Sequence, residues 1–295
     1  MKLYLDHNVY IECAKNEELK NFIIDICRRK KIQMLYGAAH IEEVYTVEVK
    51  PKSPNKEYQP KILQTIDEMT NSTDIMPTLT GLVMKREKTS AVYERVRAYD
   101  TTEIVKSDSE ERLKNDRYNH ARLRREDKES SYISANRSPS DIWEYPAVKK
   151  CIDDFNAHSR EFIARHNESL RMLESISISG TDLRLPYDFQ LIRGSYENRL
   201  KNSYSELELA VELLMRVLHY CGYHAENEER KAISSTHDTT HCIYATASDC
   251  IISMDKNFYF RCMAVYDFLG VKTQVRYAED IEGLKRIIEQ ICTVH

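Results

Sequence analysis

The amino-acid sequence predicts an α/β protein with a central parallel sheet and a mostly α-helical insertion. Short apolar runs that suit buried strands alternate with longer segments of helical periodicity near both ends of the chain. Alternation of this kind produces parallel sheets that are covered by helices. The middle of the chain lacks the pattern and is rich in charge, so we expect residues 1–100 and 204–295 to form one core and residues 101–203 to be an insertion.

Composition narrows the classes of protein to which the chain can belong. Its 295 residues are 42% apolar, which is enough for a sizeable core, and its net charge of −4 excludes a basic coat for nucleic acid. The glycine-rich phosphate-binding patterns GxGxxG and GxxxxGK do not occur. The eight cysteines form no CxxC pair, the first residues do not resemble a signal peptide, and no apolar run reaches membrane-spanning length. We therefore expect a reduced, cytoplasmic protein that does not enter a membrane.

The first expected element is a strand over residues 2–5, which ends at Asp6. Two helices follow, VYIECAK and EELKNFIIDICRRKK, and the second has apolar residues on one face. Its last turn carries a basic cluster, residues 28–31. Cations stabilise the negative end of a helix dipole, so we interpret this cluster as a solvated helix cap, with a contact to nucleic acid as the alternative.

A second strand is expected over residues 32–36, and the helix GAAHIEEVYTVEVK after it carries Glu42 and Glu43. Three prolines mark residues 51–60 as a loop. The next segments, KILQTIDEMT and DIMPT, suit a helix and a short strand, respectively. We expect GLVMKREKTSAVYERVRAYDTT to form one further helix.

The insertion begins with a stretch that is dense in charges of both signs, which predicts a solvated helix or hairpin. The alternative is a groove for a polyanion, because arginine and aromatic side chains suit single strands. The arginines that would line it are Arg117, Arg122, Arg124 and Arg125. Two helical segments are expected after residue 141.

A long helix that begins near residue 204 leads into the C-terminal block. There we expect a helix over residues 237–248, with Asp238 at its start, and a buried strand CIIS that is followed by Asp255. A helix that ends at Gly270, a strand in VKTQVRY and an amphipathic closing helix complete the chain.

Four carboxylates follow strands or lie in helices beside them in this pattern: Asp6, Glu43 (or Glu42), Asp238 and Asp255. Parallel strands bring their carboxyl ends to one edge of a sheet, and sites in open sheets lie at that edge. Gathered carboxylates repel one another unless a cation lies among them. Oxygen ligands of this kind select Mg²⁺ or Mn²⁺, and such ions promote the hydrolysis of phosphodiesters. The set therefore predicts a metal-dependent nuclease.

Three stretches, DHNVYI, HIEEV and HDTTHCIYATASDCIISMDKNF, together resemble the PIN-domain nucleases. The resemblance implies a PIN-like three-layer α/β/α fold. It implies that the catalytic and metal-binding residues are Asp6, Glu43, Asp238 and Asp255. It further implies supporting roles for Asn8, Glu42, His241, Asp249 and Ser253.

The function that the resemblance implies is an endoribonuclease that depends on Mg²⁺ or Mn²⁺ and acts on single-stranded or structured RNA in preference to DNA. Toxins and antiphage-defence effectors often carry a PIN domain, so an inhibitory or activating protein partner is expected, and a homo-oligomer is left open. The alternative is a non-catalytic PIN-like scaffold that binds RNA or a protein. A phosphohydrolase of the haloacid dehalogenase type is disfavoured, because Asn8 stands where that chemistry needs a second aspartate. Zinc at His237 and His241 is disfavoured because no third histidine is near in the sequence.

Overall fold

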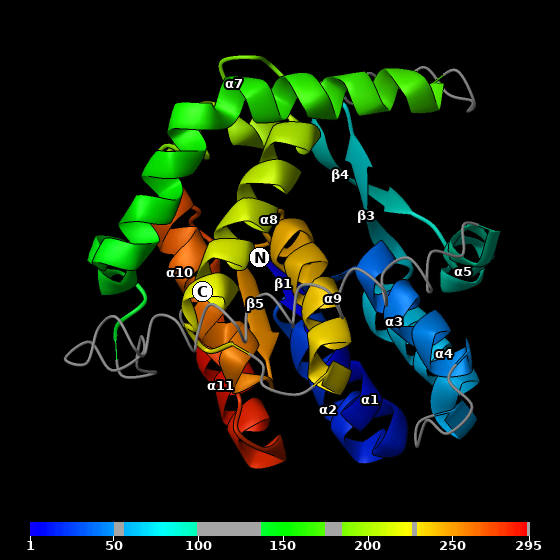
Figure 1. Cartoon of the computed structure of the whole chain (residues 1–295). Helices are drawn as coiled ribbons and strands as arrows, with labels where there is room; N and C mark the ends of the chain where they lie inside the picture. The colour runs from blue at the N-terminus through cyan, green and yellow to red at the C-terminus, as the bar shows by residue number, and fades with distance from the viewer. Residues whose placement is uncertain (50–55, 99–136, 175–184, 226–228, 294–295) are drawn as a thin grey trace.

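A six-stranded sheet forms the centre of the molecule (Figure 1). The structure is a computed structural model that describes residues 1–49, 56–98, 137–174, 185–225 and 229–293. The strands are β1 (Lys2–Leu5), β2 (Gln33–Gly37), β3 (Thr73–Thr78), β4 (Gly81–Arg86), β5 (Cys250–Ser253) and β6 (Gln274–Tyr277). Their order across the sheet is β4-β3-β2-β1-β5-β6, and each neighbouring pair is parallel except β3 and β4. The prediction of an α/β fold is confirmed, with a sheet that is mixed rather than wholly parallel.

The antiparallel pair is a hairpin that corrects the predicted helix from Gly81 onward. β3 turns back into β4 through Leu79 and Thr80, and Thr78 pairs with Gly81. Gly81 has a φ of +114°, and a Cβ there would lie 2.3 Å from the carbonyl oxygen of Lys201, so only glycine fits the position. A helix does follow, but it begins at Thr89. Strand β4 was not predicted, because most of its residues are exposed and its sequence has no alternation of apolar and polar residues.

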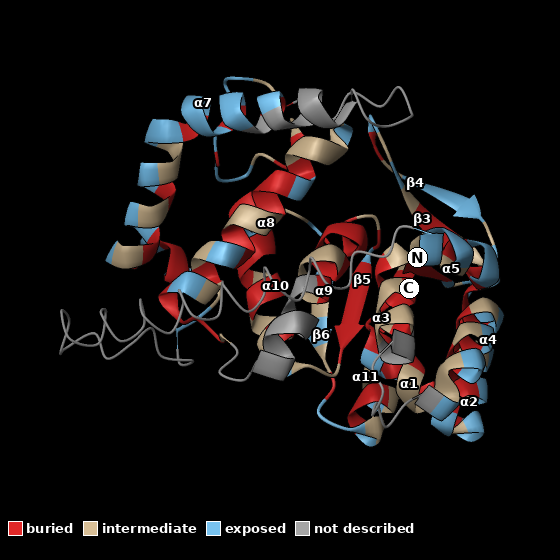
Figure 2. Cartoon of the chain, turned by 45° about the vertical axis from the view of Figure 1, so that its right-hand side comes forward, coloured by how far each residue is buried: buried red, intermediate tan, exposed pale blue. Residues whose placement is uncertain are grey.

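Two layers of helices enclose the sheet, one on each face. The strands alternate between them: Leu3 and Leu5 pack into one apolar cluster, and Tyr4 between them packs into the other. The first face is covered by α1 (His7–Lys15), α2 (Glu17–Arg29), α4 (Gln59–Thr70) and α11 (Ile281–Thr293). The opposite face is covered by α8 (Tyr204–Cys221), α9 (Glu229–Ala245) and α10 (Lys256–Leu269). Figure 2 shows β5 buried between these layers, whereas β4 at the edge of the sheet is exposed.

The other described helices are α3 (Ala38–Val49), α5 (Thr89–Ala98) and α7 (Pro146–Glu174), with short 3-10 turns η1 (Lys56–Tyr58), η2 (Asp141–Glu144) and η3 (Leu200–Asn202). α7 is one helix of 29 residues where two segments were predicted. It packs against α8 (Figure 1). None of the helices among the described residues combines the length and apolar content that a membrane crossing requires.

The described part of residues 101–203 packs into the same apolar cluster as the sheet. The indole Nε1–H of Trp143 donates to the carbonyl of Ala264 on α10 at 2.9 Å, and the Trp143 ring lies 4.9 Å from that of Phe268. The backbone N–H of Tyr196 donates to the carbonyl of Leu269 at 2.9 Å. The division of the chain into core and insertion stays a prediction, but this segment contributes buried surface to the core.

Candidate metal centre

Asp6 lies directly after β1, where the strand gives way to α1. Its backbone N–H continues the sheet by donating to the carbonyl of Ile252 at 2.9 Å, and its side chain is the N-cap of α1. One carboxylate oxygen accepts the N–H of His7 at 2.8 Å, and the other accepts the hydroxyl of Ser253 at 2.7 Å. Asp6 is only 4% exposed. The strand and the cap therefore hold this carboxylate in place at the carboxyl end of the sheet.

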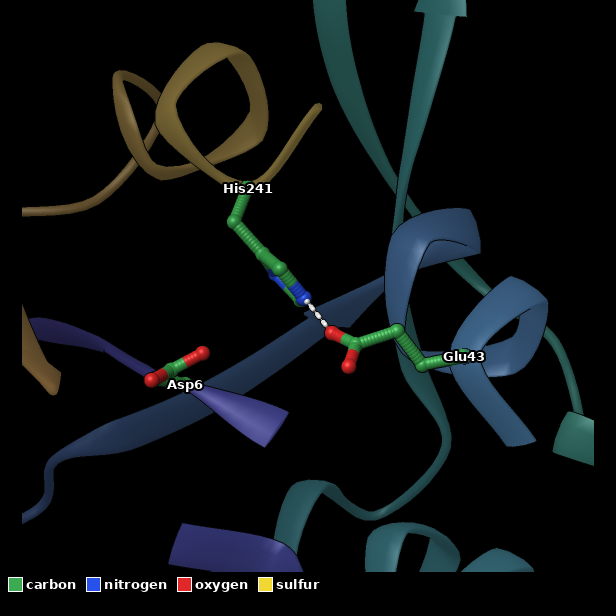
Figure 3. A group of neighbouring side chains, drawn as sticks. All are labelled: Asp6, Glu43 and His241. Atoms are coloured by element: carbon green, nitrogen blue, oxygen red, sulfur yellow. Dashed lines mark hydrogen bonds and ion pairs between the residues drawn. The ribbon is translucent and has the colours of Figure 1, made fainter. Parts of the chain in front are cut away.

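Two further side chains, from helices on either side, meet Asp6. Glu43 comes from α3 and His241 from α9, and their Oε1 and Nε2 atoms lie 2.7 Å apart (Figure 3). One ligand atom from each of Asp6, Glu43 and His241 lies within 4.8 Å of the others. In the part of the chain that the structure describes, this is the only group of three or more histidine, cysteine or acidic residues that meets this distance. Residues nearly 240 positions apart thus form one compact donor set.

The second nitrogen of His241 contacts a buried hydroxyl. The Tyr4 hydroxyl lies 2.8 Å from Nδ1 of His241 and 3.5 Å from Nδ1 of His40. Nε2 of His40 lies 2.8 Å from the carbonyl of Leu5, to which it donates, so the His40 Nδ1 is left as an acceptor. When His241 donates Nε2–H to Glu43, its Nδ1 accepts from Tyr4. When its Nε2 lone pair faces a cation, Nδ1–H can donate to Tyr4; Nδ1 of His40 accepts the N–H of Gly37 at 3.1 Å.

Burial and mutual repulsion shift the pKa values in this donor set. Burial raises the pKa of Asp6 to about 6, with Glu43 and Asp255 adding to the rise and His241 opposing it. Burial also acts to raise the pKa of Glu43, but His7 and His241 outweigh it and hold that pKa well below its ordinary value. Burial lowers the pKa of His241, but the bond to Glu43 and the nearby carboxylates outweigh burial and raise it. The carboxylates of Asp6 and Glu43 repel each other, His241 offsets part of this repulsion, and a bound cation would relieve the rest.

Asp238 lies beside this donor set but is paired with a cation of the protein. The prediction that it begins a helix is wrong: α9 starts at Glu229, because no glycine or proline interrupts the sequence before it. Its Oδ2 accepts from Nη2 of Arg261 at 2.6 Å, and Arg261 is fully buried. Burial raises the pKa of Asp238 to about 8, Arg261 opposes the rise, and Asp255, Asp6 and Glu43 add to it.

Asp255 and Ser253 connect β5 to the cluster. Asp255 comes just after the strand, as predicted. It is also the N-cap of α10, and its Oδ1 accepts the N–H of Phe258 at 2.8 Å. The hydroxyl of Ser253 accepts the N–H of Asp255 at 2.9 Å and donates to Asp6. Ser253 therefore links the two strand-end aspartates. The Asp255 carboxylate acts on Asp6 through its charge and is not one of the three clustered donors.

The other predicted residues lie farther from the cluster. Glu42 is turned toward His237, 3.7 Å from Nδ1, and its side chain is 40% exposed. Asn8 is exposed on α1. Asp249 lies at the opposite end of β5, where it accepts the backbone N–H of Lys2 at 2.6 Å, so the structure does not bring it to the cluster. The four predicted groove arginines, Arg117, Arg122, Arg124 and Arg125, lie outside the described residues.

His7 is a site residue that the sequence interpretation missed. Its side chain is 2% exposed, yet neither ring nitrogen has a hydrogen-bond partner among the described residues. Its charge interacts with Glu43 and His241, which places the ring beside the donor set. A signal was present in the sequence, because each acidic motif contains a histidine: DHN, HIEE and HDTTH. A buried imidazole without a partner costs stability unless something else bonds to it.

The donors suit a divalent cation. Two carboxylates supply hard oxygen atoms, and His241 can supply a nitrogen. Asp255 and Asp238 lie close enough to the set to interact with its carboxylates through their charges. Clustered, buried carboxylates at the end of a parallel sheet are the arrangement that a bound cation stabilises.

Comparison of the chain with protein-family models, with curated proteins and with solved structures returns no match. The PIN-domain resemblance consequently stays a prediction, and the site has to be interpreted from its own geometry.

Proposed function

We propose that the protein is a divalent-metal-dependent nuclease of the PIN-like type, and that Asp6, Glu43 and His241 hold the cation. The observation that carries the proposal is the convergence of these three donors, from three separate elements, within 4.8 Å of one another. Support also comes from the chain order of the acids: Asp6 follows β1, Glu43 lies in the helix after β2, Asp238 lies in the helix before β5, and Asp255 follows β5. The resemblance implied this order.

The donor set favours Mn²⁺ over Mg²⁺. Mg²⁺ takes oxygen ligands almost entirely, whereas Mn²⁺ accepts both carboxylate and imidazole. His241 lies close enough to Asp6 and Glu43 to share one ion with them. With Mg²⁺, His241 would keep its bond to Glu43 and orient that carboxylate instead.

The chemistry proposed is hydrolysis of a phosphodiester in RNA. A cation bound here would act as a Lewis acid toward a phosphate oxygen and assist the attack of water on phosphorus. The bond from phosphorus to the leaving oxygen breaks, and that oxygen takes up a proton. His7 is placed to donate to a phosphate oxygen, because its ring nitrogens are buried beside the donor set and unused by the described protein.

A non-catalytic scaffold that binds RNA or protein is the second candidate. It is favoured by one observation: two of the four predicted acidic ligands are not among the clustered donors, since Asp238 pairs with Arg261 and Asp255 caps α10. The donor set of Asp6, Glu43 and His241 weighs against it, because a binding surface gains nothing from buried mutual repulsion.

A cleavage assay with a matched pair of variants tests the proposal. We expect the wild-type protein to cut a labelled single-stranded RNA with Mn²⁺ and to lose activity in EDTA. Asp6→Asn should lower the rate by more than ~100-fold, because it weakens a direct ligand. The control is Asp25→Asn, the same substitution at an exposed aspartate of α2, which should leave the rate within about twofold. Equal rates for the two variants, or cleavage that persists in EDTA, would overturn the proposal.

A further inference from the structure

A cavity of about 1030 Å³ opens where strands β1, β5 and β6 begin, at the opposite end of the sheet from Asp6. Lys2, Asp249 and Gln274 line it at the starts of these three strands. Small-molecule sites span about 300–1,000 Å³, so this one is large enough for a nucleotide. Nothing in the candidate metal centre lines it, and an inference about it does not depend on the nuclease proposal.

The lining of this cavity is strongly basic. Its two acidic residues are Glu197 and Asp249. Its six cationic residues are Lys2, Arg29, Lys30, Lys31, Lys201 and Lys272. The lining therefore carries a net charge of +4, although the whole chain carries −4. Concentrating cations in a cleft on an acidic molecule raises the local concentration of anions.

The two acids neutralise only part of this charge. Glu197 lies 3.2 Å from the ammonium of Lys201 and 3.6 Å from that of Lys272, so it holds both lysines on one wall. Asp249 accepts the backbone N–H of Lys2 rather than a side-chain cation. Across the described ranges, no carboxylate lies within ion-pair distance of the side chains of Lys2, Lys30 or Lys31. These three cations face the cavity without a protein counter-charge there.

Lys31 occupies a backbone position that disfavours lysine. It has a φ of +55° just after α2. The N–H of Ile32 donates to the carbonyl of Cys27 at 2.8 Å, and the N–H of Lys31 donates to the carbonyl of Arg28 at 3.2 Å. This is a Schellman helix end, in which glycine normally takes the left-handed position. A helix cap needs no lysine at this residue, since Arg28 and Arg29 already lie at the negative end of the dipole.

The remaining groups in the lining suit an aromatic base better than a bare anion. Leu82 and Met84 of β4 add apolar surface, and Met84 is 38% exposed. The hydroxyls of Ser248 and Thr273 donate to backbone carbonyls at 2.7 Å, so they are not available as donors to a ligand. Anion recognition therefore falls to the lysines and Arg29, beside an apolar surface.

We propose that this cavity is a second binding site, which takes a phosphate-bearing nucleotide ligand. Its lysines hold the phosphates, and its apolar wall takes the base. A free nucleotide and one end of a single RNA strand present the same chemistry, and binding measurements can separate these two sources.

The test measures binding by fluorescence polarisation, with a labelled nucleoside triphosphate and a labelled ten-residue single-stranded RNA as the two probes. EDTA is present, so that no cation bridges a probe to the acidic cluster. Micromolar or tighter binding that weakens with salt is expected for at least one probe. If the triphosphate alone binds, or binds as tightly as the RNA, the source is a free nucleotide. If the RNA binds much more tightly, the source is a strand.

Two double variants test whether binding depends on the cations that line the cavity or only on the net charge of the protein. Lys30→Gln combined with Lys31→Gln should weaken binding about tenfold and flatten its salt dependence by about 1.4 in slope for a single strand. The matched control is Lys15→Gln with Arg28→Gln, which removes two cations that do not line the cavity and should change binding less than twofold. Equal effects of the two double variants would overturn the proposal, as would tighter binding of a polyglutamate peptide than of either probe.

A second variant excludes damage to the fold as the cause. Lys31→Gly removes one cation but relieves the left-handed position, so the melting temperature should rise by about 2 °C while binding weakens. Weakened binding in a more stable protein supports the site. Unchanged binding by this variant, together with a raised melting temperature, contradicts a role for Lys31.

Discussion

Strands β1 and β5 each run from a basic end to an acidic end, and the two ends differ in how their charges are held. At the acidic end, Asp6 and His241 are buried and tied to neighbours by short hydrogen bonds. At the basic end, Lys30 and Lys31 are exposed and have no acidic partner among the described residues. Buried like charges that repel one another suit a small cation, whereas exposed cations around a cavity suit a large anion. The same sheet thus positions two opposite kinds of site.

The largest contrast between the ends should appear in stability when one cation is removed from each. Arg261→Met leaves Asp238 without its buried partner and should lower the free energy of unfolding by roughly 3 kcal/mol. Lys272→Met, at the exposed basic end, should cost less than about 0.5 kcal/mol. Urea unfolding measures both. The double variant Arg261→Met with Asp238→Leu should recover most of the loss; failure to recover would mean that Arg261 acts mainly through its bond to the His224 carbonyl.

The second largest effect should be on metal affinity, which should depend on the acidic end of the sheet and not on the basic end. His241→Asn removes the imidazole that contacts Glu43, so the affinity for Mn²⁺ should fall about 10–100-fold in calorimetric titration. Lys272→Gln at the basic end should leave that affinity unchanged. If His241→Asn bound Mn²⁺ as tightly as the wild-type protein, the donor set would not include His241 or depend on its orientation of Glu43.

Asp74 shows what burial alone does to the pKa of a carboxyl group, because it is a buried acid that does not belong to the donor set. Burial raises its pKa to about 7, Glu87 adds to the rise, and Arg95 opposes it. Its folded pKa lies above the ordinary value of 3.8, so the ionised form destabilises the fold above pH 7, and this cost disappears as the pH falls below 3.8. Asp74→Asn should therefore stabilise the protein by a few kcal/mol at pH 8, by about 1 kcal/mol at pH 4.5 and by almost nothing at pH 3.

Urea unfolding of Asp74→Asn across this pH range makes the measurement, with Asp25→Asn on the exposed side of α2 as control. A benefit that does not change with pH would show that the gain has another source. Because Asp74 lies apart from Asp6, Glu43 and His241, Mn²⁺ should not alter the difference.

The smallest expected effect concerns His7. Replacing a buried, unpartnered ring with an apolar ring of similar shape removes an unmet hydrogen-bonding demand, so His7→Phe should change stability by less than ~1 kcal/mol, in the stabilising direction. RNA cleavage should nevertheless fall about tenfold, because the proposed donor to phosphate is lost. If cleavage were unchanged while stability rose as expected, His7 would contribute to packing only and would not act on phosphate.

The strands and the chain order of the acids could be predicted from sequence, because apolar runs that end in an acid are local signals. Strands were predicted at residues 2–5 and 74–78, and the structure has β1 and β3 there. The hairpin partner β4 was missed, since its side chains are exposed and its turn residues, Leu79 and Thr80, carry no turn signal. α9 begins eight residues before its expected start. An aspartate is typical of a helix start, but no glycine or proline before Asp238 ends the preceding helical segment.

The site could be predicted only in part, because its partners come from tertiary packing. Arg261 lies in an apolar helix and gives no sign in the sequence that it pairs with Asp238. Tyr4 is an apolar-run residue that is fully buried in the core, yet its hydroxyl also contacts His241, and nothing in the sequence indicates that contact. The resemblance implied a supporting role for Asp249, but this residue lies before β5, at the opposite end of the strand from Asp255.

The shortness of β1 has a consequence for how a charged chain approaches the molecule. Four residues span only about 13 Å, which is less than two Debye lengths of about 8 Å each at physiological salt. The fields of the two ends therefore overlap through the apolar interior of the sheet. An approaching polyanion is drawn to one pole and turned away from the other, so its orientation is biased before contact, and the rate of encounter should rise as salt is removed.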